Sequence, residues 1–270
     1  MAVIKMNFLS KALGMQTNVT ICLPSYSFAD VMQNRDDIYV QSMKYQVLWL
    51  LHGGSGDDSD YVNFSNIVRY ADDNKLAVVM PADFNAMYSD DPAGSAYYKF
   101  VVEELPEMCA ALFPFSTKRE DNFIAGLSMG GMGTFKCAML NPEKYAAAIC
   151  MSGAGSDPSI KREGRAGTML ARPMPDWKIV VPGSDIDAWA AAKRNVENGV
   201  EVPKMWLTSG DKDFVLEGVR KCRDYLQELG YDLTYDEVPG YGHEWDFWDL
   251  TLRKALKDWL PIRHSVIYPE

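Results

Sequence analysis

Short apolar runs alternate along this chain with longer segments of helical character. The runs are rich in β-branched and other apolar residues and end at Gly, Pro, Asp or Ser, which is typical of buried strands. They predict strands at residues 3–9, 19–23, 45–51, 76–80, 122–125, 146–151, 204–208 and 233–238. The composition and end signals of the intervening segments predict helices at residues 63–74, 96–112, 132–140, 187–198, 215–229 and 246–260.

The order of these elements indicates an α/β fold. Runs 3–9 and 19–23 have no helix between them and can pair as an antiparallel start of a sheet. Residues 25–44 are polar and irregular, and from residue 45 onward strand and helix alternate. This alternation favours a mostly parallel central sheet with helices on both faces, joined by right-handed crossovers. The active site of such a sheet is expected at the carboxyl ends of its strands.

A single catalytic domain over residues 1–270 is expected, because a chain of this length buries one large core. Its content of 47% hydrophobic and 24% charged residues is that of an ordinary soluble globular protein. The longest departure from the strand and helix pattern is residues 152–203, which are rich in Gly, Pro and charge between 156 and 176. We interpret that segment as a lid or excursion over the site.

Charge and cysteine content argue against several partners. The chain has 27 Lys and Arg against 37 Asp and Glu, a net charge of −10 without a basic cluster, which disfavours nucleic acid and anionic membranes. Its five scattered cysteines are expected to be reduced core thiols, and with three dispersed histidines they predict no metal site and no cofactor. No apolar run has the length of a signal peptide or membrane helix, so a cytoplasmic protein is expected.

The run Ile-Ala-Gly-Leu-Ser-Met-Gly-Gly at residues 124–131 carries the strongest chemical signal in the chain. It predicts a strand, a sharp turn that presents Ser128, and the start of a helix. Flanking glycines allow so tight a turn that the serine hydroxyl is exposed beside the free N–H groups of the helix N-terminus. Such a serine is typical of acyl transfer. The alternative is a glycine-rich turn with an incidental serine.

A nucleophilic serine needs a histidine to accept its proton. His243 lies in a loop between the last predicted strand and the last helix, from which its imidazole can reach back over the sheet toward Ser128, so it is the leading candidate. The alternative is a surface-loop or helix N-terminal histidine. His52 directly follows the strand at 45–51 and is expected to shape a turn, and His264 lies in a peripheral tail.

The carboxylate partner is expected in the run Gly-Asp-Lys-Asp at residues 210–213, which gives the chain order Ser, Asp, His. In this turn the fourth residue points inward, which selects Asp213 and leaves Asp211 to cap the turn or face solvent. Glu244 and Asp246 are too close to the histidine in sequence to reach its ring, and Asp246 is interpreted as a helix N-cap.

An oxyanion that forms at the substrate carbonyl needs two fixed hydrogen-bond donors. The backbone N–H of Met129, which directly follows the serine, is one candidate. The glycine-rich turn at residues 52–54 supplies the other, and we assign it to the N–H of Gly54. A flexible loop tip is the alternative interpretation of that turn.

These residues resemble the α/β-hydrolase esterases of the esterase D group, which includes tributyrin esterases, S-formylglutathione hydrolase, feruloyl and acetylxylan esterases and mycolyltransferases. The resemblance covers most of the chain, and residues 30–44 and 156–182 depart from it. It implies the α/β-hydrolase fold and a triad of Ser128, Asp213 and His243. The Gly-Leu-Ser-Met-Gly-Gly and His-Glu-Trp runs are most similar to small intracellular tributyrin or acetyl esterases. The segments of the chain that carry the resemblance are residues 10–24, 50–54, 78–81, 103–106, 124–131, 210–214 and 242–245.

The expected function is metal-independent hydrolysis of carboxylic esters through an acyl-enzyme on Ser128. The resemblance implies short acyl groups, acetyl to butyryl, on a small-molecule or carbohydrate ester, acetylated or feruloylated carbohydrate included. An acyltransferase or a thioesterase such as S-formylglutathione hydrolase is the alternative, and a non-catalytic binding protein on the same scaffold is a further one. Oligomeric state is left open, a homo-oligomer included. Candidate pocket residues, each with a core or lid role as the alternative, are Met87, Tyr88, Trp189, Phe214 and Trp245.

Overall fold

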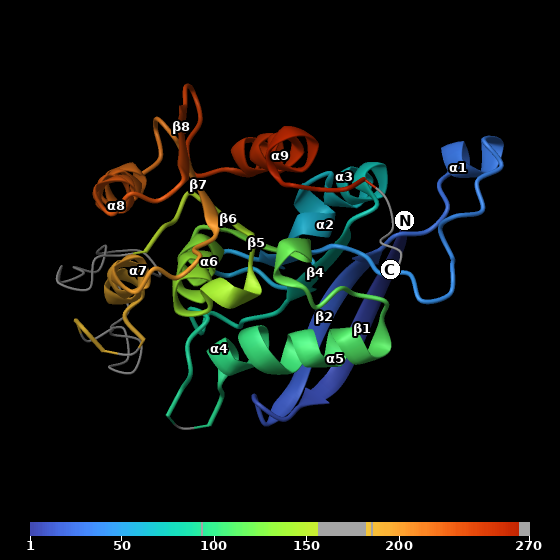
Figure 1. The fold of residues 1–270 in the computed structure, drawn as a ribbon, viewed down its shortest axis with the longest axis horizontal. Helices are drawn as coiled ribbons and strands as arrows, with labels where there is room; N and C mark the ends of the chain where they lie inside the picture. Colours follow the sequence, from blue (N-terminus) through green and yellow to red (C-terminus); the bar gives the residue numbers. More distant parts are fainter. Residues whose placement is uncertain (93, 156–181, 185, 265–270) are drawn as a thin grey trace.

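The computed structural model describes residues 1–92, 94–155, 182–184 and 186–264, and an eight-stranded sheet runs through its centre (Figure 1). The strand order is β1-β2-β4-β3-β5-β6-β7-β8. The first two strands pair antiparallel, β2 pairs antiparallel with β4, and all other neighbours are parallel. The bounds are β1 Ala2–Ser10, β2 Met15–Leu23, β3 Val47–Leu51, β4 Ala77–Pro81, β5 Asn122–Leu127, β6 Ala147–Met151, β7 Lys204–Gly210 and β8 Leu233–Val238.

Burial along the strands explains this arrangement. Every residue of β3, β4, β5 and β6 is buried, because helices cover both faces of the parallel part of the sheet. β1 instead alternates between exposed and half-buried positions, as an edge strand of an antiparallel hairpin does. The predicted α/β class with a mostly parallel sheet is therefore confirmed.

The helices form a layer on each face of the sheet. Successive residues of β3 point to opposite faces, so Trp49 packs into a core with α5, α6 and α8, while Leu48 and Leu50 pack into a second core with α3 and α9. The bounds are α1 Phe28–Met32, α2 Asp60–Phe64, α3 Ile67–Asn74, α4 Tyr97–Lys99, α5 Leu105–Leu112, α6 Met129–Leu140, α7 Ala188–Glu197, α8 Leu216–Glu228 and α9 Trp245–Lys254. Single π-helical turns continue the paths of α4 and α9, at Phe100–Glu104 and Ala255–Trp259.

Several predicted helix bounds were wrong. The helix predicted at 63–74 is two helices, α2 and α3, separated where Ser65 is extended and its hydroxyl donates to the Tyr61 carbonyl at 2.6 Å. The helix predicted from residue 132 begins at Met129, immediately after the serine turn. The helix predicted from Asp246 begins at Trp245 with Glu244 as N-cap residue, so Asp246 lies in the first turn rather than at the cap.

The segment at 25–44, predicted irregular, contains α1. A capping box between Ser27 and Asp30 starts this helix. Asp30 is buried and pairs with Lys75 at 2.6 Å and with Arg35 at 3.1 Å. Burial works to raise the pKa of Asp30, but the hydrogen bonds from Lys75 and Ser27 outweigh it and hold that pKa far below its ordinary value.

Other expectations concern the whole chain. The five cysteines are buried and free, as predicted. No helix within the described ranges combines the length and apolar character needed to cross a membrane.

Of the predicted excursion at 152–203, residues 156–181 and 185 lie outside the described residues. Within the remainder, Ser152 to Gly155 are buried beside the serine turn, and α7 packs against the core through Ala191 and Ala192.

Candidate active site

Ser128 occupies a strained turn between β5 and α6. Its backbone angles are φ 52° and ψ −116°, a conformation that costs a residue with a side chain of the order of 1–3 kcal/mol. Two glycines make this turn sterically feasible. A Cβ atom on Gly126 would lie 2.3 Å from the Gly130 carbonyl oxygen, and a Cβ atom on Gly130 would lie 2.1 Å from the Leu51 carbonyl oxygen. The spacing of glycines around Ser128 therefore reflects close packing of β5, α6 and β3.

The structure brings together the three side chains that the sequence analysis singled out. His243, in the loop between β8 and α9, places its Nε2 atom 2.9 Å from the Ser128 hydroxyl oxygen. The Nδ1 atom of the same ring lies 3.0 Å from both carboxylate oxygens of Asp213, which follows β7. Each residue thus lies just past the carboxyl end of a strand of the parallel sheet.

The Asp213 carboxylate determines the protonation pattern of this group. An ionised carboxylate only accepts hydrogen bonds, so the proton of the neutral imidazole lies on Nδ1 and Nε2 is left as the acceptor for the Ser128 hydroxyl. Burial works to raise the pKa of Asp213, but hydrogen bonds from His243, Ser152 and the Val215 N–H outweigh it and lower that pKa. The arrangement can take a proton from the serine hydroxyl while Asp213 remains charged.

The neighbouring acids lie as the sequence analysis expected. Asp211 is exposed, and its carboxylate accepts a hydrogen bond from the Gly240 N–H at 2.8 Å, which ties the β7–α8 and β8–α9 loops together. Glu244 is exposed and accepts from the Gly242 N–H at 2.7 Å. His264 lies exposed near the end of the chain.

His52 is buried and supports the turn at residues 52–54. Its Nδ1–H donates to the Gly53 carbonyl at 2.7 Å, and its Nε2 accepts from the Asp83 N–H at 2.9 Å, so both ring nitrogens are used within the protein. Burial lowers the pKa of His52, which favours the neutral ring that these two bonds require. The expectation that His52 shapes a turn is confirmed.

The turn that His52 supports lies against the serine. A Cβ atom on Gly53 would be 3.5 Å from the Ser128 Cβ atom. The Ser55 N–H donates to the Asn85 side chain at 2.6 Å, whereas no acceptor for the Gly54 N–H is found in the described part of the chain. Met129 begins α6, where N–H groups have no acceptor within the helix. The turn that carries Gly54 thus packs against Ser128 through Gly53, and Met129 directly follows Ser128 in the chain.

The aromatic candidates for a pocket have different surroundings. The ring of Phe214, 48% exposed, lies 4.5 Å from the His243 ring. Tyr88 is fully buried, and its hydroxyl donates to the His52 carbonyl, so it belongs to the core that supports the turn. Trp245 packs edge-on against Tyr61. Two others are partly buried, Met87 against the first core and Trp189 stacked on Tyr225.

Sequence reasoning missed two buried residues next to the triad. Ser152 follows β6, and its N–H donates to the Thr208 carbonyl of β7 at 2.8 Å. Trp248 on α9 donates its indole N–H to the Ser152 hydroxyl oxygen at 2.9 Å. The sequence carries no local signal for either contact, because the three residues come together only when β6, β7 and α9 pack.

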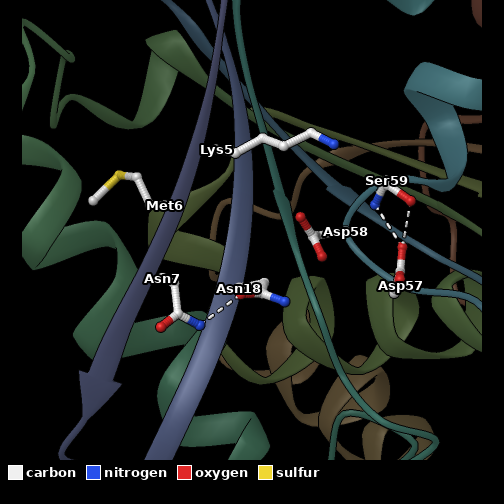
Figure 2. Close-up of a pocket in the computed structure, with 7 residues that line it drawn as sticks. All are labelled: Lys5, Met6, Asn7, Asn18, Asp57, Asp58 and Ser59. Atoms are coloured by element: carbon white, nitrogen blue, oxygen red, sulfur yellow. Dashed lines mark hydrogen bonds between the residues drawn. The ribbon is translucent and has the colours of Figure 1, made fainter.

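A separate pocket lies against the β1–β2 hairpin (Figure 2). Its volume is about 270 Å³, and Asn7 bonds to Asn18 at 2.7 Å along its wall. None of the triad side chains lines it, so we assign no part of the chemistry to it. Within the described ranges, no three His, Cys, Asp or Glu side chains are grouped so as to hold a metal ion. The lining residues are Lys5, Met6, Asn7, Asn18, Asp57, Asp58 and Ser59.

The fold and this site define a serine hydrolase with the α/β-hydrolase fold. The chain belongs to the family described as "Putative esterase", whose model matches residues 10–259. It is 30% identical over 268 residues to the acetyl esterase of Caldicellulosiruptor saccharolyticus, with 96% of this chain and 98% of that protein covered. These matches show that the chain is an esterase.

Two solved structures from Staphylococcus aureus share the whole fold. The fluorophosphonate-binding serine hydrolase F, solved with substrate bound, is 29% identical with a TM-score of 0.78. The S-formylglutathione hydrolase is 28% identical with a TM-score of 0.79. In both comparisons 96% of this chain and 98% of the other are covered.

Proposed function

We propose that this esterase hydrolyses short-chain acyl esters, acetyl to butyryl, through a covalent acyl-enzyme on Ser128. The observation that carries the proposal is the continuous series of contacts from Ser128 through His243 to Asp213, at 2.9 and 3.0 Å. His243 takes the hydroxyl proton as Ser128 attacks the ester carbonyl carbon. The same ring then gives that proton to the departing alkoxide, so the alcohol leaves neutral and the acyl group stays on the serine oxygen.

Hydrolysis of the acyl-enzyme repeats these steps with water. His243 accepts a proton from water as its oxygen attacks the acyl carbon, and returns the proton to Ser128 when the carboxylic acid leaves. In both tetrahedral intermediates the N–H groups of Met129 and Gly54 are proposed to bind the oxyanion. Loss of one such donor typically costs about 3 to 4 kcal/mol of transition-state stabilisation.

The short acyl group is supported by the likeness to the acetyl esterase, which covers nearly the whole of both chains. A series of p-nitrophenyl esters with acyl chains from acetyl to decanoyl tests this. We expect kcat/KM to be highest between acetyl and butyryl and to fall for longer chains. A maximum at octanoyl or decanoyl would contradict the proposed acyl specificity, while loss of all turnover in Ser128→Ala would still support the proposed nucleophile.

A thioesterase is the second candidate, because one close structural relative is an S-formylglutathione hydrolase. The same acyl-enzyme chemistry serves both substrates, since only the leaving group differs. Hydrolysis of S-formylglutathione and of p-nitrophenyl acetate by one preparation separates them. The carboxylesterase proposal expects the larger kcat/KM on the oxygen ester, and a kcat/KM at least 100-fold larger on the thioester, about 2.7 kcal/mol in transition-state binding, would favour the second candidate.

A further inference from the structure

Phe214 packs against the histidine of the triad. The centroids of the Phe214 and His243 rings lie 4.5 Å apart, with an interplanar angle of 39°. Phe214 directly follows Asp213, and hydrogen bonds hold the chain on both sides of it. The Asp213 N–H donates to the Gly210 carbonyl at 3.1 Å, and the Val215 N–H donates to the Asp213 carboxylate at 3.0 Å. The position of the Phe214 ring is therefore tied to that of the triad.

Four neighbours of the His243 ring differ in how far they reach the surface. Nδ1 faces Asp213, whose side chain is fully buried, and Trp248, which is 6% exposed, lies edge-on to the imidazole with 5.0 Å between ring centroids. Phe214 is instead 48% exposed, and Ser128 at Nε2 is half-buried. The His243 side chain itself keeps 18% of its surface exposed. An ester that approaches the imidazole beside Ser128 therefore meets Phe214.

The mechanism determines which part of the ester lies beside the imidazole. In the tetrahedral intermediate the acyl carbon carries the Ser128 oxygen, the oxyanion, the acyl chain and the alcohol oxygen. The alcohol oxygen has to receive the proton from His243 Nε2, so it must come within about 2.6–3.2 Å of that atom. The acyl chain is a different substituent and diverges from the alcohol oxygen at the tetrahedral carbon. The group on the alcohol oxygen is therefore the part of the substrate nearest to Phe214.

We propose that Phe214 determines the alcohol specificity of this esterase: its ring contacts the alcohol group of the ester and favours alcohols with an apolar ring next to the ester oxygen, as in benzyl esters. This proposal rests on the proposed function, because it assigns Phe214 to the same acyl-enzyme reaction. An apolar group that packs on the Phe214 ring leaves water, and an aromatic group adds the favourable electrostatics of ring pairing. A methyl group is too small to gain either contribution.

Two variants at Phe214 test the proposal on acetate esters that differ only in the alcohol. Phe214→Ala removes the ring, and Phe214→Leu keeps an apolar side chain without it. We expect kcat/KM for benzyl acetate to fall about 10-fold in Phe214→Ala and about threefold in Phe214→Leu, mostly through KM. Methyl acetate should keep its kcat/KM within about twofold of the wild type in both variants.

The comparison of the two esters separates a specificity role from a positioning role. If Phe214 only holds the His243 ring in place, its loss lowers kcat for benzyl and methyl acetate alike. Such a uniform loss would overturn the proposal, and so would wild-type kcat/KM on benzyl acetate in folded Phe214→Ala. If Phe214→Ala does not fold, the same two results in Phe214→Leu overturn it.

An acyl series shows which side of the ester Phe214 contacts. The p-nitrophenyl esters of acetate, propionate and butyrate share one alcohol group and differ in the acyl chain. We expect the fold-loss of kcat/KM in Phe214→Ala to be the same for all three esters within about twofold. A loss that grows with acyl length would place Phe214 beside the acyl chain and would overturn the proposal.

The matched control is Phe64→Ala. The Phe64 ring is 57% exposed and lies tilted against Trp245, with 5.3 Å between centroids and an interplanar angle of 36°. It therefore resembles Phe214 in exposure and in ring contact, but its partner is an indole rather than the imidazole of the triad. We expect wild-type kcat/KM on both acetates in Phe64→Ala. An equal loss on benzyl acetate in Phe64→Ala and Phe214→Ala would overturn the specific role of Phe214.

The Ser128→Ala variant separates this proposal from the proposed function. Turnover of both acetates at the wild-type rate in Ser128→Ala would refute the serine mechanism, whatever the Phe214 variants do. An inactive Ser128→Ala, together with a uniform loss or no loss in the Phe214 variants, would refute only the alcohol specificity.

Discussion

His243 Nε2 lies 2.9 Å from the Ser128 hydroxyl oxygen, although the two residues are 115 positions apart in the chain. The parallel sheet makes this contact feasible, because β5 and the strands that follow end at the same edge. When the ring is neutral, this contact and the one with Asp213 place its single proton on Nδ1.

Replacement of Asp213 by Asn should nearly abolish turnover with little change in fold. The amide can donate to Nδ1, which stabilises the wrong imidazole tautomer and leaves no charge to balance the imidazolium. We expect kcat to fall about 10⁴-fold, the size of effect known for this change in a serine protease triad. Steady-state kinetics on p-nitrophenyl acetate measure it.

Asp211→Asn is the matched control. Asp211 is two residues away, exposed, and bound to the Gly240 N–H rather than to the histidine. We expect kcat within about twofold of the wild type, because an exposed substitution of this kind is close to neutral. A larger loss in Asp211→Asn than in Asp213→Asn would reverse the assignment of the acid.

Gly130→Ala should destabilise the folded enzyme. The new Cβ atom would lie 2.1 Å from the Leu51 carbonyl oxygen and 2.6 Å from that of His52, and both contacts are with backbone that cannot rotate away. Overpacking of this kind costs about 1–3 kcal/mol or more. We expect the free energy of unfolding in urea to fall by at least that amount.

Gly218→Ala, within α8, provides the comparison. A Cβ atom there meets nothing within 4 Å, so only helix propensity changes. We expect a gain of about 0.5–1 kcal/mol in the free energy of unfolding. Equal effects of the two alanines would show that the close packing around Gly130 does not constrain the turn.

The buried His52 should make stability depend on pH. Burial lowers its pKa in the folded state, while the unfolded chain has a value near 6.5. The unfolded state therefore binds more protons as the pH falls below about 6.5. The contribution of the neutral His52 ring to the free energy of unfolding is complete above this pH. It is lost as the pH falls toward the pKa of His52 in the folded protein, with a slope of up to about 1.4 kcal/mol per pH unit.

His52→Gln should reduce that slope between pH 7 and pH 5, measured by urea unfolding at each pH. His264→Gln, a change at an exposed histidine, should leave the slope as in the wild type. An unchanged slope in His52→Gln would show that His52 does not supply the pH dependence.

The parts of this site that the sequence predicted are those encoded locally. The turn at Ser128 is specified by glycines that lie within two residues of it, and the choice of Asp213 over Asp211 follows from one four-residue turn. His243 could be chosen because the alternation of strands and helices placed its loop at the correct edge of the sheet. The fold class follows from the same alternation.

The missed features depend on contacts between distant segments. The hydrogen-bond partners of Ser152 come from β7 and from α9. Its positive φ could not be predicted, because the residue at this position is not a glycine. The helix α1 is stabilised by Lys75, which is 45 residues from Asp30 in the chain. Asp is a residue type that is favoured at helix N-caps, but α9 begins at Trp245, one residue before Asp246. Local residue preference alone therefore gave the wrong start for this helix.

The role of Ser128 as nucleophile is tested most directly by the site at which a fluorophosphonate labels the active enzyme, determined by mass spectrometry of peptides. The proposed mechanism predicts a single covalent adduct on Ser128, loss of esterase activity in proportion to labelling, and no adduct in folded Ser128→Ala. Full activity in an enzyme whose Ser128 is fully labelled, or inactivation through an adduct on another residue, would contradict it.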